Sequence, residues 1–105
     1  QVNISGEAAK SGVAPDEVPA LAHAVAALPR LRLRGLMAIP EPRDDPGEQR
    51  PPLAAMKELF DAQRAAGFAD WDTLSMGMSA DLEVAIEQGA TMVRVGTALF
   101  GERAK

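Results

Sequence analysis

Short apolar segments alternate with amphipathic segments along the chain, and this alternation most constrains how it can fold. Strand-like runs occupy residues 1–4, 33–39, 72–75 and 91–95. Each is followed by a segment with helical spacing of its apolar residues or by a short helical piece. Strands that alternate with helices form parallel sheets with right-handed crossovers. The sequence therefore predicts an α/β fold of four strand–helix units, in an open doubly wound sheet or in part of a barrel.

Proline and glycine residues mark the expected ends of the helices. The first helix is expected over residues 15–29 and the second over residues 51–67, each opened by proline. Residues 41–50 carry two prolines and a glycine among charged residues, which is typical of a loop. Ser79 is an N-cap candidate for a third helix.

Four strand–helix units are half of the eight that close a TIM-like β/α barrel. A half-barrel leaves sheet edges unpaired, and the chain opens directly on a strand-like run. We therefore expect residues 1–105 to form the carboxyl-terminal half of a single β/α barrel domain with parallel strands. Its partner would be the amino-terminal half of the same barrel or a second copy of the chain.

Composition excludes several classes of function. No apolar run reaches about 18 residues and no basic leader is present, so neither a membrane span nor a secreted precursor is predicted. The chain has no cysteine and one histidine, which argues against disulfides and against a metal site. Its net charge of −4 argues against binding to nucleic acid.

Two glycine-containing turns are predicted at the ends of the last two strands, around Gly77 and Gly96. In β/α barrels, phosphate groups often bind at the loops after these two strands. Glycine lets the backbone approach an anion closely, and Ser79 and Thr97 add hydroxyl groups. The turns therefore predict a shared phosphate site. The alternative is that both glycines serve only tight turns and that Ser79 only caps its helix.

Arg94 and Met37 are further candidates at the same end of the predicted sheet. Arg94 stands between two valines in a strand, and an arginine that points inward there needs an anion or ligand to receive it. Met37 lies near Met76 and Met78 at the predicted strand ends. These methionines are either flexible core residues or a wall against a ligand ring.

Three stretches of the chain resemble one protein family. They are LSMGMSADLEVAIEQGATMVRVGTALFGER at residues 74–103, LMAIP at 36–40 and QVNISGEAAKSG at 1–12. The chain closely resembles the pyridoxal 5'-phosphate homeostasis protein family, whose barrel is similar to that of alanine racemase. The resemblance covers essentially the whole chain. It implies pyridoxal 5'-phosphate as the cofactor, held by a lysine on the first strand of the barrel, a strand that this chain lacks.

The resemblance also implies roles for individual residues. Ser79, Gly96 and Thr97 look like phosphate ligands, with Gly77 and Met37 beside the cofactor. Arg94 looks like the partner of the pyridine nitrogen or of the phosphate.

The function implied is that of a non-catalytic, cytoplasmic carrier that controls the level of the cofactor. One alternative is a pyridoxal-phosphate enzyme such as an amino-acid racemase, which often needs a tyrosine that this chain lacks. Another is half of a phosphate-binding biosynthetic enzyme with a different ligand.

Overall fold

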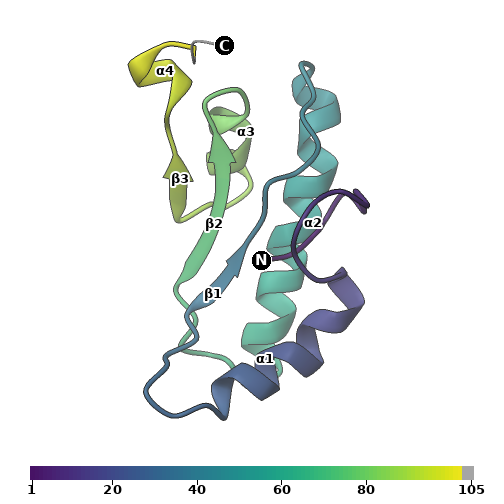
Figure 1. Ribbon diagram of the computed structural model, residues 1–105, viewed down its shortest axis with the longest axis vertical. Coiled ribbons are helices and arrows are strands. Elements are labelled where there is room, and N and C mark those ends of the chain that lie inside the picture. Colours follow the sequence, from purple (N-terminus) through teal and green to yellow (C-terminus); the bar gives the residue numbers. More distant parts are fainter. Residues whose placement is uncertain (103–105) are drawn as a thin grey trace.

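The computed structural model describes residues 1–102, so Arg103 and the end of the predicted domain lie outside the described residues. Three parallel strands form one sheet in the order β1-β2-β3, with helices between them (Figure 1). The elements in chain order are a 3-10 turn η1 (Pro15–Glu17), α1 (Val18–Ala26), β1 (Gly35–Met37), α2 (Pro46–Ala65), β2 (Thr73–Met78), α3 (Leu82–Glu87), β3 (Met92–Arg94) and α4 (Thr97–Phe100). The α/β class and the parallel strands are confirmed.

The first predicted strand, residues 1–4, does not join the sheet as a strand. Val2 donates one backbone hydrogen bond to the Met37 carbonyl at 2.8 Å, which places it beside β1. The Asn3 N–H then turns away and donates to the Val13 carbonyl, while the Asn3 side chain exchanges hydrogen bonds with the backbone of Glu7. These local bonds compete with a ladder to β1, so the sheet has three strands where four were predicted.

The second helix begins at Pro46 and not at Pro51, so the predicted loop is wrong over its last five residues. Pro51 and Pro52 lie inside α2 and have no N–H to donate. The carbonyls that lose a donor are those of Gly47 and Glu48, four residues earlier. Both residues are exposed, so water can satisfy these carbonyls and the helix continues through the prolines.

Strand β2 continues through the residues predicted as a turn and ends at Met78. Ser75 pairs with Met92, and Met78 pairs with Arg94, so β2 carries one extra residue between the two pairs. This is a bulge, and Gly77 lies within it at a φ of +103°. A Cβ at Gly77 would lie 2.6 Å from the Cβ of Ala85, so glycine is needed here for α3 to pack against β2.

The helices α2 and α3 pack on one face of the sheet. Leu74 and Met76 point to this face and are fully buried, together with residues of α2 such as Leu53 and Met56. Paired residues of neighbouring parallel strands point the same way and alternate along each strand. The opposite face therefore carries Met37, Ser75, Met92 and Arg94. Apolar side chains are exposed on this open face or just beyond its strand ends, namely Ile39, Met78, Met92, Val95, Leu99 and Phe100.

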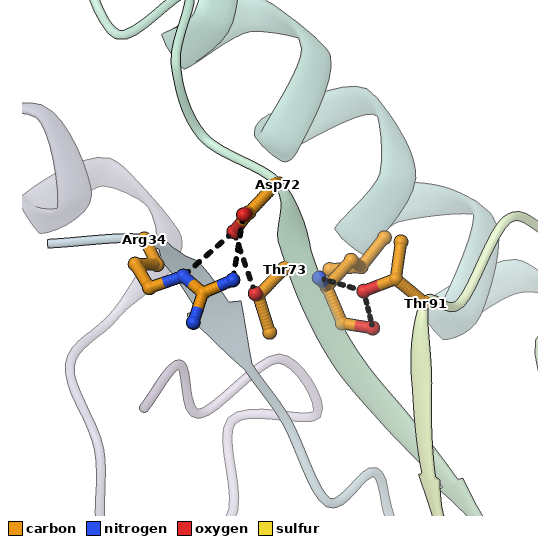
Figure 2. A network of polar contacts seen from close by, with 5 residues as sticks. Arg34, Asp72, Thr73 and Thr91 are labelled. Carbon is orange, nitrogen blue, oxygen red and sulfur yellow. Dashed lines mark hydrogen bonds and ion pairs between the residues drawn. The ribbon is translucent and has the colours of Figure 1, made fainter.

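Polar contacts join the strands at the amino end of the sheet (Figure 2). The Arg34 guanidinium donates to both oxygens of Asp72, at 2.9 and 2.6 Å, and the Thr73 hydroxyl donates to the same carboxylate at 2.8 Å. These contacts lower the pKa of the Asp72 carboxyl to about 2. The Thr91 hydroxyl accepts a hydrogen bond from the Leu74 N–H at 2.7 Å, which joins the start of the β3 segment to β2.

Among residues 1–102, no helix combines the length and the apolar character needed to cross a membrane.

Candidate functional site

A pocket of about 600 Å³ lies at the carboxyl ends of the strands, and four of the six predicted site residues line it. They are Gly77, Ser79, Gly96 and Thr97. The loop after β1 supplies the facing wall, with Ile39, Pro40, Pro42 and Arg43. The two predicted turns thus meet at one pocket, because parallel strands bring their carboxyl ends to the same edge of a sheet.

The Ser79 hydroxyl connects these two turns. Its oxygen accepts hydrogen bonds from the backbone N–H groups of Gly96 at 3.3 Å and Ala98 at 2.9 Å. Ser79 is not the cap of α3, which begins at Leu82, so that interpretation is wrong. The hydroxyl serves the start of α4 instead and keeps its own proton free to donate.

Gly96 and Gly77 line the same pocket but have different surroundings. No heavy atom lies within 4 Å of the position that a Cβ would take at Gly96, and its φ of −121° does not require glycine. Neither packing nor the sign of φ therefore requires glycine at position 96, whereas both require it at position 77. The space beside Gly96 is open to a ligand.

Arg94 lies on the open face and does not line the pocket. Its Nη2 atom donates to the Ala38 carbonyl at 2.9 Å, so the side chain reaches across β2 to the end of β1. Its Nε atom is buried and has no hydrogen-bond partner among residues 1–102. A buried N–H without an acceptor is costly, so this atom would gain from an acceptor on a ligand.

The methionines divide between the two interpretations given above. Met76 is fully buried against the helices and is a core residue. Met78 lines the pocket and is 44% exposed. Met37 is half-buried on the open face of β1, outside the pocket.

Arg43 and Gln49 were not predicted as part of the site. Arg43 lines the pocket and forms an ion pair with Glu41 at 3.0 Å. It supplies a cation beside the four predicted residues. Gln49 binds backbone atoms of the loops that form the pocket. The available signal for Arg43 was its place in the loop that follows a predicted strand, where ligands of parallel sheets bind.

No group of three or more histidine, aspartate or glutamate side chains within the described range 1–102 is arranged to hold a metal ion.

Comparison with known proteins places the chain in a family. Residues 1–104 match the family described as alanine racemase, N-terminal domain. A pyridoxal phosphate homeostasis protein of Pseudomonas aeruginosa is 60% identical over 103 residues, which are 98% of this chain and 43% of that protein. A protein of the same name from Vibrio cholerae is 52% identical over 105 residues, with the same coverage of both chains. The chain thus spans less than half the length of these relatives.

A solved structure shares the fold. PipY of Synechococcus elongatus, determined with pyridoxal 5'-phosphate bound, superposes with a TM-score of 0.79 at 31% identity, over 89% of this chain and 44% of PipY. The match of almost every residue to one family agrees with the arrangement of strands and helices described above. The chain therefore belongs to the alanine racemase N-terminal domain family.

Proposed function

We propose that this chain is part of a cytoplasmic, pyridoxal 5'-phosphate-binding β/α barrel that controls the level of the cofactor and does not itself turn over a substrate. The similarity to pyridoxal phosphate homeostasis proteins and to PipY with its bound cofactor supports pyridoxal 5'-phosphate as the ligand. The observation that carries the proposal is the Ser79 hydroxyl, which joins the two turns at the pocket.

The residues at the pocket fit a phosphate group. The Ser79 and Thr97 hydroxyls can donate to phosphate oxygens, and the open space beside Gly96 allows the backbone to come close. Arg43 adds positive charge on the facing wall. Charge-assisted hydrogen bonds of this kind are about twice as strong as neutral ones. These side chains would bind and orient the phosphate end of the cofactor.

Arg94 would act at the other end of the ligand or on the phosphate, through its unpartnered Nε atom. When bound, the cofactor supplies a reactive aldehyde and an electron-withdrawing ring. A permanent guanidinium charge beside the ring nitrogen disfavours protonation of that nitrogen, and so weakens electron withdrawal. This favours storage over catalysis. Met37 and Gly77 would lie near the ligand without donating to it.

The apolar open face needs a cover. Met92 is 53% exposed and Phe100 83% exposed. Exposed apolar side chains gathered at one face are typical of an interface. We infer that further strands of the barrel, from the same polypeptide or a second copy of this chain, cover it.

The rival function is amino-acid racemisation. A phenolic proton donor for that reaction would have to come from outside these 105 residues, because they contain no tyrosine.

The test is binding of pyridoxal 5'-phosphate and of pyridoxal to the intact protein and to Ser79→Ala. We expect the variant to bind the phosphorylated ligand roughly tenfold more weakly, since a hydrogen bond to a charged group contributes about 1.5–3 kcal/mol, while pyridoxal is hardly affected. Ser11→Ala, in an exposed connection, is the matched control. Equal losses for both ligands would contradict a phosphate site, and racemisation by the wild-type protein would favour the rival.

A further inference from the structure

Gln49 is a buried polar side chain in the first turns of α2, only 6% exposed. Its amide nitrogen donates one hydrogen bond to the Arg43 carbonyl at 2.8 Å and another to the Ala80 carbonyl at 3.2 Å. A glutamine amide has two N–H donors, so both are used. This side chain thus has a specific pair of partners and is not simply core filling.

The two acceptors belong to separate loops that form the walls of the pocket. Arg43 lies in the loop after β1, and Ala80 lies in the loop after β2, beside Ser79. Both residues line the pocket of about 600 Å³. Within residues 1–102, no hydrogen bond runs directly between residues 39–45 and residues 79–81. The amide of Gln49 is therefore the polar link between these walls.

The first turns of α2 have few hydrogen bonds of their own, so the contacts of Gln49 matter more for their position. Pro51 and Pro52 remove two intrahelical hydrogen bonds from the segment that carries Gln49. The Asp45 carbonyl accepts from the N–H groups of Glu48 and Gln49, which fixes the helix start to the end of the β1 loop. The position of the first turns thus depends on their contacts with the loops as well as on the helix itself.

We infer that Gln49 is a positioning residue, whose single amide holds the two loops at the spacing that a phosphate group requires. It touches no ligand itself and acts through the backbone of Arg43 and Ala80. The ligand part of this inference rests on the proposed function, whereas the link between the loops does not.

The test compares Gln49→Met with Gln63→Met in the intact protein. Methionine has a similar length but no donor. Gln63 is the matched control, because it lies on the same helix, is 5% exposed and does not line the pocket. Gln49→Glu serves as a second variant, since a carboxylate of the same size cannot donate to either carbonyl.

Two measurements are made, hydrogen exchange of peptides that cover residues 39–45 and 78–81, and affinity for pyridoxal 5'-phosphate and pyridoxal. We expect both Gln49 variants to raise exchange in both loops together, because the carbonyls of Arg43 and Ala80 lose their shared donor. We expect them to weaken binding of the phosphorylated ligand about tenfold, the loss that corresponds to about one hydrogen bond. Pyridoxal affinity and the Gln63→Met protein are expected to change little.

The inference is overturned if the Gln49 variants leave hydrogen exchange unchanged in both loops, or if exchange rises in one loop only. Unchanged affinity for pyridoxal 5'-phosphate in a Gln49 variant of a protein whose wild type binds it also overturns the inference. If the wild type does not bind this ligand, the proposed function is wrong, and the exchange measurement alone decides whether Gln49 holds the loops.

Discussion

Gly77 and Gly96 line the same pocket, but they have different roles because the space around each one differs. The Cβ that Gly77 lacks would overlap Ala85, and its φ of +103° is one that other residues rarely adopt. The Cβ that Gly96 lacks would meet nothing within 4 Å. One glycine therefore serves the packing of α3 on the sheet, and the other leaves room at the pocket.

Alanine substitutions should separate these tasks. We expect Gly77→Ala to lower the free energy of unfolding by about 1–3 kcal/mol, because the methyl group overpacks against α3. Gly96→Ala should change that free energy by no more than about 0.5 kcal/mol, as at other open sites, but should weaken binding of pyridoxal 5'-phosphate. Denaturant unfolding and ligand titration measure the two effects. A stable Gly77→Ala protein would contradict the role given to the bulge.

The Arg34–Asp72 ion pair predicts a dependence on pH. The pKa of the Asp72 carboxyl is lowered from 3.8 to about 2, chiefly by the hydrogen bond from Arg34. A lowered pKa means that the contribution of this carboxylate to stability is complete above pH 3.8 and is lost as the pH falls through about 2. Arg34→Gln should return the pKa toward its ordinary value, as followed by NMR titration of the carboxyl carbon.

Arg32→Gln is the control for this titration. Arg32 acts on Asp72 only through its charge and is the weakest of the causes of the shift. Its removal should move the Asp72 pKa much less than removal of Arg34 does. Equal shifts from the two variants would mean that general positive charge, and not the paired hydrogen bonds, sets this pKa.

At the scale of elements, the alternation of apolar and amphipathic segments correctly predicted the kinds and order of the elements from α1 onward, but residues 1–4 do not form the strand that was predicted. The alternation did not predict where α2 begins, because the pair Pro51-Pro52 has the usual signature of a first helical turn. Whether the freed carbonyls can reach water depends on exposure in the folded molecule. The end of β2 was missed for a similar reason, because Gly77 reads as a turn residue unless the position of Ala85 is known.

Four of the six predicted site residues come together because the ends of parallel strands share one edge of the sheet, which the sequence pattern does imply. The same rule could have pointed to Arg43, which follows β1, but it could not have pointed to Gln49. The contribution of Gln49 depends on how the loop folds back over the start of α2, and no spacing in the sequence encodes that contact.

The start of α2 can be tested with proline substitutions. We expect Pro51→Ala to stabilise the protein by up to about 3 kcal/mol, because it restores a hydrogen bond to the Gly47 carbonyl in the helix interior. Pro46→Ala is the matched control and should give no gain, since proline suits the first position of a helix. The measurement is the free energy of unfolding. If α2 began at Pro51, neither substitution would stabilise the protein.

At the scale of the whole molecule, helices α2 and α3 cover one face of the sheet (Figure 1). Apolar side chains such as Met92 are exposed on the other face. The helices cover one face only, as they cover the outer face of the sheet in a β/α barrel. The chain also spans 43% of the length of the relatives from Pseudomonas aeruginosa and Vibrio cholerae. Both observations favour a barrel that needs strands beyond the three described.

The chain of 105 residues, studied alone, should therefore self-associate. Met92→Lys should reduce that association, because it places a charge on the open face. Leu31→Lys is the control, since Leu31 is 60% exposed but lies in the connection between α1 and β1. Size-exclusion chromatography with light scattering gives the mass. A monomer that melts cooperatively would contradict the expected interface.

The ion pair of Arg34 with Asp72 and the pocket lie at opposite ends of the same strands. The contacts that join strand to strand at the amino end do not include any residue of the pocket wall. Barrel proteins with this division accept changes in their ligand-facing loops while the opposite end keeps the strands aligned. For protein engineering, this makes residues 39–42 and 98–101 the segments to exchange when a different phosphorylated ligand is wanted. Arg43, Gly96 and Thr97, which are proposed to bind the phosphate, and the contacts at the amino end would be kept unchanged.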